Sequence, residues 1–350
     1  MHRMFLRHLK RAASCAKKDW RLFATVSPFD SSDWHDACSE VGHLIEESLA
    51  MVPGLKSEDT LTAVRQLFDR KDLPHAAVGT LSNMVSTVRG NRSHGSLMSM
   101  FFDITPPCTG NSADELKATK RHMVAATRMC HAFQMCHDAV VTTGAMKHEE
   151  TENEQLITLN KLMTLVGDFF IVNAAKLITD FRDNEILYTF AKGLEFCSSC
   201  DFNEPPGDGV SVLWWEEHNT EKHFLFISML EIALLLKGTR CEEARRMTRL
   251  FGRNLVLALQ ASQDTEYFMD HSNDLSYVNV TCLPMILMSD QRCADCEGIT
   301  TRDSPKSLDC TVVRSRSVQQ KYVSFLLEYL ENCEASQEKV SMIKVVQSLS

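Results

Sequence analysis

The chain has 350 residues and a formal net charge of -9, with 24% charged and 44% hydrophobic residues. A chain of this size can bury a sizeable core, and its acidic balance argues against nucleic-acid binding, which calls for a basic face. The two most apolar stretches are either interrupted by polar residues or too short for a bilayer span of about 20 apolar residues. We therefore expect neither a nucleic-acid partner nor an integral membrane protein.

The N-terminal segment, residues 1–27, is strongly basic. It contains seven lysines and arginines against one acid, Asp19, and Phe5, Leu6 and Leu9 would share one side of a helix. The segment has no long apolar core of the kind that secretory signals carry. This pattern is typical of a mitochondrial transit peptide, with a basic disordered tail as the alternative. We expect mitochondrial (matrix) localisation, with one all-α domain over residues 28–350.

Amphipathic periodicity dominates the rest of the chain, and strand-like alternation is scarce. Breaks are expected at residues 89–95, 106–112, 198–211 and 289–317, where Gly, Pro, Ser and charged residues accumulate. Between these breaks, apolar residues recur at spacings of three and four. The helices predicted in this way cover residues 34–52, 57–70, 74–102 (interrupted at 89–95), 112–141, 154–181, 183–196, 213–237, 241–268 and 319–350.

Two of these segments carry more specific signals. Ser112 and Glu115 form an S-x-x-E capping box, which predicts a helix start at this point. The 154–181 helix is apolar nearly all round, so we expect it to be central. Gly167 in its middle costs about 1 kcal/mol relative to alanine, which predicts either a close packing contact or a ligand contact there.

Thirteen cysteines are scattered along the chain. Their odd number and the lack of a secretory signal favour free thiols in a reducing compartment. Two CxxC pairs, Cys197/Cys200 and Cys293/Cys296, have the spacing of zinc knuckles. Neither pair lies in a compact module rich in Gly and aromatic residues, so we expect free thiols and no metal. No Gly-rich phosphate loop in a strand–turn–helix setting and no G-x-S-x-G elbow is present.

Two helical segments resemble the signature helices of the trans-polyprenyl-diphosphate synthases. They are "NKLMTLVGDFFIVNAAKLITDFRDNEILYTFAKGLEF" (160–196) and "FGRNLVLALQASQDTEYF" (251–268). The resemblance extends from about Trp34 to the C-terminus and is weakest across 198–220 and 285–318. It implies the all-α helical bundle of the isoprenoid synthases.

The family's chemistry depends on carboxylates. An allylic diphosphate ionises, and isopentenyl diphosphate attacks the resulting carbocation. Two D-D-x-x-D motifs on facing helices hold Mg²⁺ ions, which bind the diphosphate oxygens. The resemblance places both motifs on degenerate sequences, each with one carboxylate of three: Asp138, Ala139 and Thr142 for the first motif, and Gln263, Asp264 and Tyr267 for the second. We expect no catalytic residue and no metal site in this chain.

Other family positions are only partly matched. The basic motif that grips isopentenyl diphosphate is missing, with only Arg89 and Arg92 in its region, and the Lys-Thr pair is replaced by Lys222-His223. Six positions of the family pattern are retained: Lys161, Gly167, Asp168, Gly252, Arg253 and Gln260. Of these, Lys161, Asp168 and Gln260 could line a cavity or could be polar groups satisfied between helices.

A fold with both metal motifs eroded resembles the non-catalytic second subunit of heteromeric decaprenyl-diphosphate synthases. The resemblance implies a catalytic partner subunit that holds the Mg²⁺, a heterotetramer that makes the ubiquinone side chain, and interface contacts near 116–141 and 154–181. One departure is that this chain keeps the His137-Asp138 start of the first motif. Two alternatives stay open: a weakly active prenyltransferase with Asp138, Asp168 and Asp264 around one Mg²⁺, and an isoprenoid-binding carrier or scaffold.

Overall fold

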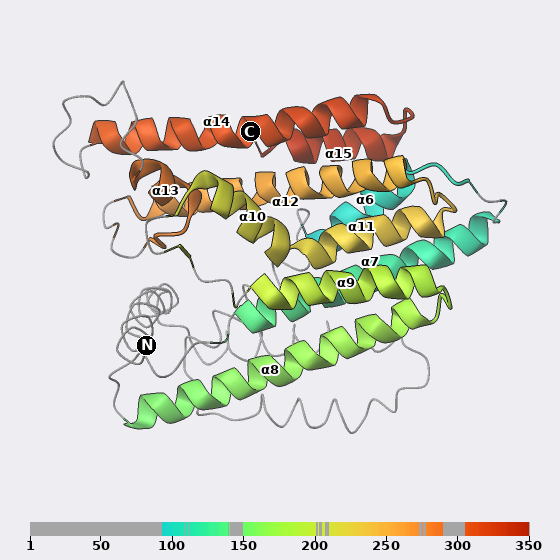
Figure 1. The fold of residues 1–350 in the computed structure, drawn as a ribbon, viewed down its shortest axis with the longest axis horizontal. Coiled ribbons are helices and arrows are strands. Elements are labelled where there is room, and N and C mark those ends of the chain that lie inside the picture. The colour runs from blue at the N-terminus through green and yellow to red at the C-terminus, as the bar shows by residue number, and fades with distance from the viewer. Residues whose placement is uncertain are drawn as a thin grey trace. The chain divides into compact units, whose positions relative to one another are not determined.

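The computed structural model describes residues 93–349, except for 109, 111, 139, 141–149, 201, 203–204, 207–209, 273–274, 276–277 and 290–304. Regular secondary structure within these residues is helical, with no strand (Figure 1). The helices are α6 (His94–Ile104), α7 (Ala113–Asp138), α8 (Glu150–Thr179), α9 (Asn184–Cys200), α10 (Val212–Lys222), α11 (Phe224–Leu236), α12 (Glu242–Asp270), α13 (Leu283–Ser289), α14 (Pro305–Glu331) and α15 (Gln337–Gln347). The prediction of an all-α fold is confirmed.

Residue contacts divide the chain into two compact units. The first contains Ala113–Asp183 together with the chain up to Ser99, and the second contains Met100–Ser112 and Asn184–Ser350. In the first unit α7 packs along α8. The buried stripe of α7 includes Met123, Ala126, Cys130 and Phe133, four of the residues that the apolar periodicity predicts.

Gly167 lies where α8 packs closely against α7. A Cβ atom at this position would lie 2.7 Å from Cδ2 of His137 and 3.2 Å from Cβ of Cys136. A larger residue would therefore push the two helices apart. Of the two reasons that the sequence offers for this glycine, helix packing is the one that the structure supports.

The second unit is built around α11 and α12. Each residue of α11 from Leu225 to Leu235 is buried. This helix contacts α9 and α12, and α12 in turn packs along α14 (Figure 1). Phe251 of α12 stacks on Phe101 of α6, with ring centroids 5.5 Å apart, and lies 4.7 Å from the ring of Tyr329 of α14. The core of this unit thus lies along the length of α12.

Three sequence predictions are wrong in detail. The continuous helix expected over 213–237 is broken at His223, which has φ -97° and ψ 12°. The irregular segment expected over 289–317 is helical from Pro305 onward. Hydrophobic periodicity did not predict this helix, because its buried positions include the small polar residues Thr311 and Ser315. The loop expected over 89–95 ends before His94, where α6 begins.

A further correction concerns α8, which was expected to be central. One of its faces is exposed in the isolated chain, with Ile157, Leu165 and Val172 exposed by 43%, 57% and 66%. The predicted transit peptide over residues 1–27 and the helices expected at 34–52, 57–70 and 74–88 lie outside the described residues. Among the helices that the structure describes, none combines the length and the apolar character needed to cross a bilayer.

Two buried glycines of the second unit differ in what a methyl group would meet. At Gly193 of α9 an added Cβ would lie 2.6 Å from Oγ of Ser228 and 3.2 Å from Cα of Leu225, whereas at Gly252 of α12 it would lie 3.0 Å from Cδ1 of Leu230. We predict that Gly193→Ala lowers the free energy of unfolding by about 1–2 kcal/mol, since overpacking outweighs the gain in helix propensity. Gly252→Ala should leave the free energy of unfolding nearly unchanged, because the Leu230 side chain can rotate to move its Cδ1 atom away from the added methyl group. Urea denaturation of both variants checks this, and equal effects would contradict the packing at Gly193.

Candidate functional site

The first-motif position lies at the end of α7 in the first unit. Asp138 is the last residue of α7 and is exposed, whereas Ala139 and Thr142 lie outside the described residues. Nε2 of His137 lies 3.5 Å from Oδ1 of Asp168 on α8. The structure therefore places Asp168, a retained family position, beside the His137-Asp138 start of the motif.

Lys161 and Asp168 are both exposed on α8. They are seven residues apart and so lie on the same side of the helix. The exposed apolar residues Leu165 and Val172 occupy this side as well. Lys161 and Asp168 thus belong to an open helix face of the isolated chain.

The second-motif position lies on α12 in the second unit. Its three residues have different environments: Gln263 is exposed, Asp264 is buried, and Tyr267 is half-buried. The Tyr267 ring stacks on that of His271 at a centroid distance of 4.2 Å. The one carboxylate that the motif retains is therefore the one that is withdrawn from the surface.

Hydrogen bonds from three protein groups reach the Asp264 carboxylate. Oδ2 accepts one from Nε1 of Trp215 at 2.9 Å and one from the backbone N–H of Leu283 at 2.8 Å, and Oδ1 accepts one from Nε2 of Gln260 at 2.7 Å. Burial raises the pKa of Asp264, and these three hydrogen bonds and the charge of Lys222 only partly oppose it. Gln260 is thus engaged with Asp264.

A second buried carboxylate, Glu216 of α10, joins three helices. Its Oε2 accepts from Arg253 of α12 at 2.8 Å, and its Oε1 accepts from the Tyr322 hydroxyl of α14 at 2.7 Å. Lys321 lies 3.5 Å from the same Oε1. Burial works to raise the pKa of Glu216, but the Tyr322 hydrogen bond and the charges of Lys321 and Arg253 outweigh it and lower the pKa below its ordinary value.

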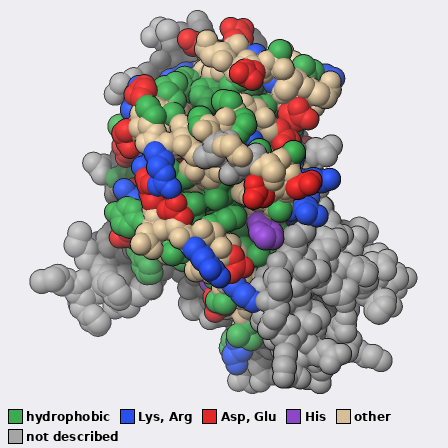
Figure 2. Space-filling model, turned by 90° about the vertical axis from the view of Figure 1, so that its right-hand side faces the viewer, with side chains coloured by type: hydrophobic (Ala, Val, Ile, Leu, Met, Phe, Trp, Pro, Cys, Tyr) green, Lys and Arg blue, Asp and Glu red, His purple; other side chains and the backbone are tan. Residues whose placement is uncertain are grey.

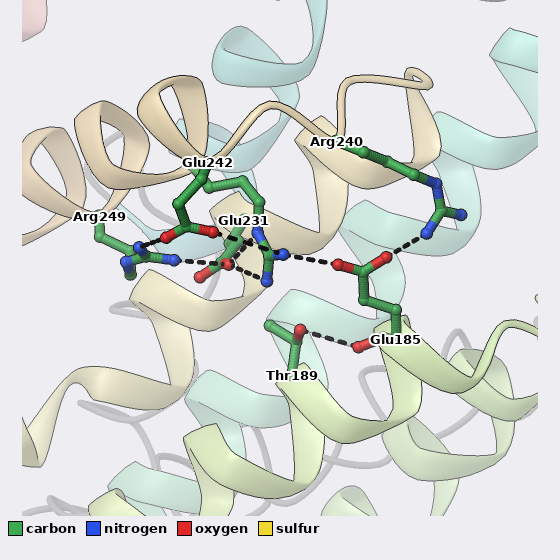
Figure 3. Close-up of polar contacts among 7 residues, drawn as sticks. Glu185, Thr189, Glu231, Arg240, Glu242 and Arg249 are labelled. Carbon is green, nitrogen blue, oxygen red and sulfur yellow. Dashed lines mark hydrogen bonds and ion pairs between the residues drawn. The ribbon is translucent and has the colours of Figure 1, made fainter.

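A third carboxylate, Glu231 of α11, is buried between two arginines of α12 (Figure 3). Arg245 approaches Glu231 to 2.6 Å and also pairs with Glu185 of α9 at 2.6 Å. Arg249 donates to Glu231 at 2.8 Å and to Glu242 at 2.6 Å. The network ties α9, α11 and the start of α12 to one another.

The outer members of this network lie at the surface. Arg240 pairs with Glu185, and the side chain of Arg240 is 54% exposed. Figure 2 shows basic and acidic side chains next to one another on one face of the molecule, with no extended field of one sign.

Arg245, Arg249 and Arg253 recur every four residues along α12 and so lie on one helix face. The sequence analysis noted Arg253 as a retained family position but missed the other two. The four-residue spacing in "EEARRMTRLFGRN" could have indicated a polar face. It could not have identified Glu185, Glu216 and Glu231 as partners, because each lies on a different helix.

The residues around Asp264 do not fit the Mg²⁺ that the family uses. Mg²⁺ is held by several oxygen ligands in near-octahedral geometry, but the second-motif position offers one carboxylate, whose oxygens already accept three hydrogen bonds. Among the described residues, no group of three or more His, Cys, Asp or Glu side chains could hold a metal ion. Cys197 and Cys200 form no disulfide, and Sγ of Cys200 donates to the backbone carbonyl of Cys197 at 3.1 Å. Cys293 and Cys296 lie outside the described residues.

The sequence comparisons point to one family. No family model matches the chain. It is 19% identical to all trans-polyprenyl-diphosphate synthase PDSS2 of Rattus norvegicus, over 82% of this chain and 75% of that protein, and 18% identical to the Homo sapiens protein of the same name, over 77% and 71%. The chain is thus similar in sequence to two proteins named all trans-polyprenyl-diphosphate synthase.

Solved structures bear out the predicted fold. A decaprenyl diphosphate synthase from Rhodobacter capsulatus matches with a TM-score of 0.55 at 15% identity, over 89% of this chain and 98% of that chain. The heptaprenyl diphosphate synthase from Staphylococcus aureus matches with a TM-score of 0.59 at 11% identity, over 89% and 97%. The chain therefore has the all-α fold of the polyprenyl synthases.

Arg245 and Arg246 are adjacent in sequence, but their partner carboxylates differ in burial. Arg245 pairs with the buried Glu231, whereas Arg246 pairs with the exposed Glu243. We predict that Arg245→Ala lowers the free energy of unfolding by about 2–4 kcal/mol, because it removes a partner of a buried charge. Arg246→Ala should change it by less than about 0.5 kcal/mol. Urea denaturation provides the measurement, and a similar loss in both variants would contradict the network.

The lowered pKa of Glu216 predicts a pH dependence. Because its folded-state pKa lies below the ordinary value of 4.5, its contribution to stability is present above that value and is lost as pH falls through the folded-state pKa. Glu216→Gln should therefore flatten the decline in stability below pH 4.5, as measured by denaturation at a series of pH values. Glu217→Gln, at the exposed neighbouring position, should leave the profile unchanged. A profile that Glu216→Gln does not alter would contradict this assignment.

Proposed function

We propose that this chain is a non-catalytic subunit of a heteromeric all-trans polyprenyl-diphosphate synthase of the decaprenyl type. The observation that carries the proposal is the state of Asp264. It is the one carboxylate left in the second motif, and it is buried and hydrogen-bonded to three protein groups. A carboxylate in this state is not available to hold Mg²⁺ against a diphosphate.

The residues at the first-motif positions also support the proposal that the chain is non-catalytic. Ionisation of an allylic diphosphate requires that the departing diphosphate be neutralised, which the family achieves with clustered carboxylates and Mg²⁺. Asp138 is the one acid at the three first-motif positions, which Ala139 and Thr142 complete. In this proposal chain elongation from farnesyl and isopentenyl diphosphates takes place on a partner subunit, which holds the Mg²⁺.

The exposed face of α8 supports the proposed partner. Leu165 and Val172 are exposed by 57% and 66% on one side of this helix, and Ile157 lies on the same side. Obligate interfaces are large and apolar. The proposed occupant is the catalytic subunit of a heterotetramer in the mitochondrial matrix, where the product would supply the ubiquinone side chain.

Reconstitution with a catalytic subunit tests the proposal. The full chain alone, given farnesyl diphosphate, labelled isopentenyl diphosphate and Mg²⁺, should make no product, whereas a co-expressed catalytic polyprenyl-diphosphate synthase subunit should copurify with it and be active. Leu165→Asp/Val172→Asp should reduce copurification at least about tenfold, because it places charges in an apolar interface. Tyr188→Asp, at an exposed aromatic of the second unit, is the matched control and should not reduce it.

Two outcomes would favour the alternatives. Product formation by the chain alone, lost on Asp138→Asn or Asp168→Asn, would favour a weakly active prenyltransferase, because these two acids are exposed on either side of His137. Recovery of the chain from mitochondria without any catalytic prenyl synthase would favour an isoprenoid-binding scaffold. Copurification that the α8 variant leaves intact would place the partner on another face.

A further inference from the structure

Asp264 lies at the meeting point of three helices. Its donors come from distant parts of the sequence: Trp215 of α10 precedes it by 49 residues, and Leu283, the first residue of α13, follows it by 19. The third donor, Gln260, lies one turn earlier on α12 itself. The carboxylate therefore connects α12 with both α10 and α13.

The residues around Asp264 are mostly apolar or neutral, and Lys222 is the exception. Tyr267 packs against a core cluster formed by Phe268, Val278 and Cys282. Burial, together with the charge of Asp264, raises the pKa of the Cys282 thiol to about 12. Position 267, where the metal motif has its third acid, is thus part of the packing between α12 and the segment leading to α13.

Any metal ion bound by Asp264 would have to compete with these contacts. A carboxylate has about four lone-pair sites, and the three hydrogen bonds use both sites of Oδ2 and one of Oδ1. A cation at Oδ2 would displace the indole N–H of Trp215 or the backbone N–H of Leu283, both in buried surroundings, and would leave that donor unsatisfied. Mg²⁺ would in addition have to give up water, which it does reluctantly.

We propose that Asp264 is an internal brace, which holds α10 and α13 against α12 and thereby excludes Mg²⁺ from the second-motif position even when the missing acids are restored. This inference adds to the absence of two acids from the second motif, because it assigns a structural role to the acid that remains. The inference rests on the same carboxylate as the proposed function but can fail separately, because a chain that lacks two of the three acids of each motif is non-catalytic whether or not Asp264 resists displacement by a metal ion.

Stability measurements on the full chain test the structural half of this inference. Asp264→Leu, which has similar size but cannot accept hydrogen bonds, should lower the melting temperature by at least about 5 °C, since two buried donors lose their acceptor. Asp264→Asn keeps an acceptor for both and should lower it by less than about 3 °C. Asp270→Leu, at an exposed acid of the same helix, is the control and should have little effect.

A double-mutant cycle localises the effect. Trp215→Phe removes the indole donor, so its effect should be smaller in the Asp264→Leu background than in the wild type. Trp214→Phe, at the neighbouring half-buried indole, should be additive with Asp264→Leu. Melting temperatures that respond to Asp264→Leu no more than to Asp270→Leu, or a Trp215 effect that is fully additive, would overturn the brace.

Metal binding tests the exclusion. Gln263→Asp/Tyr267→Asp restores three acids at the family spacing, and Gln263→Asp alone restores an adjacent pair at an exposed position without disturbing Tyr267. With Mn²⁺ as the probe and electron paramagnetic resonance as the readout, neither folded variant should bind Mn²⁺ at millimolar concentration. A catalytic family member with both motifs intact is the positive control. Stoichiometric binding by either variant, abolished by Asp264→Asn, would overturn the exclusion.

Discussion

Buried carboxylates need hydrogen-bond donors or positive charges as partners. In the second unit, most of the pairs between a buried carboxylate and its partner involve a residue of α12. Glu231 receives Arg245 and Arg249, and Glu216 receives Arg253. Asp264, on α12 itself, receives Trp215 from α10. A buried charge without a partner costs several kcal/mol, so each of these acids restricts the positions that the neighbouring helices can take. Apolar packing brings α10, α11 and α14 to α12. The ion pairs and hydrogen bonds then fix the register of these helices.

The same requirement bears on function. A metal site needs carboxylates that are free to leave their protein partners, whereas a structural site needs carboxylates that keep them. Asp264 meets the second condition, since both of its oxygens accept hydrogen bonds from protein groups. Asp138 at the end of α7 is exposed, and Ala139 follows it in sequence. A single exposed carboxylate holds Mg²⁺ weakly, because the ion keeps most of its water.

The sequence predicts the long helices well and the polar interior poorly. The helices α7, α9 and α12 follow apolar periodicity, and their bounds agree with the prediction to within a few residues. The start of α14 was missed because Thr311 and Ser315 form its buried face. The two metal-motif positions could be located by resemblance, but the burial of Asp264 could not, because Trp215 and Leu283 reach it through tertiary structure. Contacts between residues so far apart in sequence leave no local pattern.

The helices α8 and α11 both contain runs of apolar residues but differ in their surroundings, and the difference has a physical consequence. Each residue of α11 from Leu225 to Leu235 is buried, with α9 and α12 packed against the helix. α8 packs along α7 within its own unit and still exposes Leu165 and Val172. Burial of apolar surface contributes about 25 cal/mol of free energy per Å². Burying exposed side chains of this size would therefore stabilise a complex substantially. A second chain covering this face would remove Leu165 and Val172 from water, as the packing of α9 and α12 does for the residues of α11.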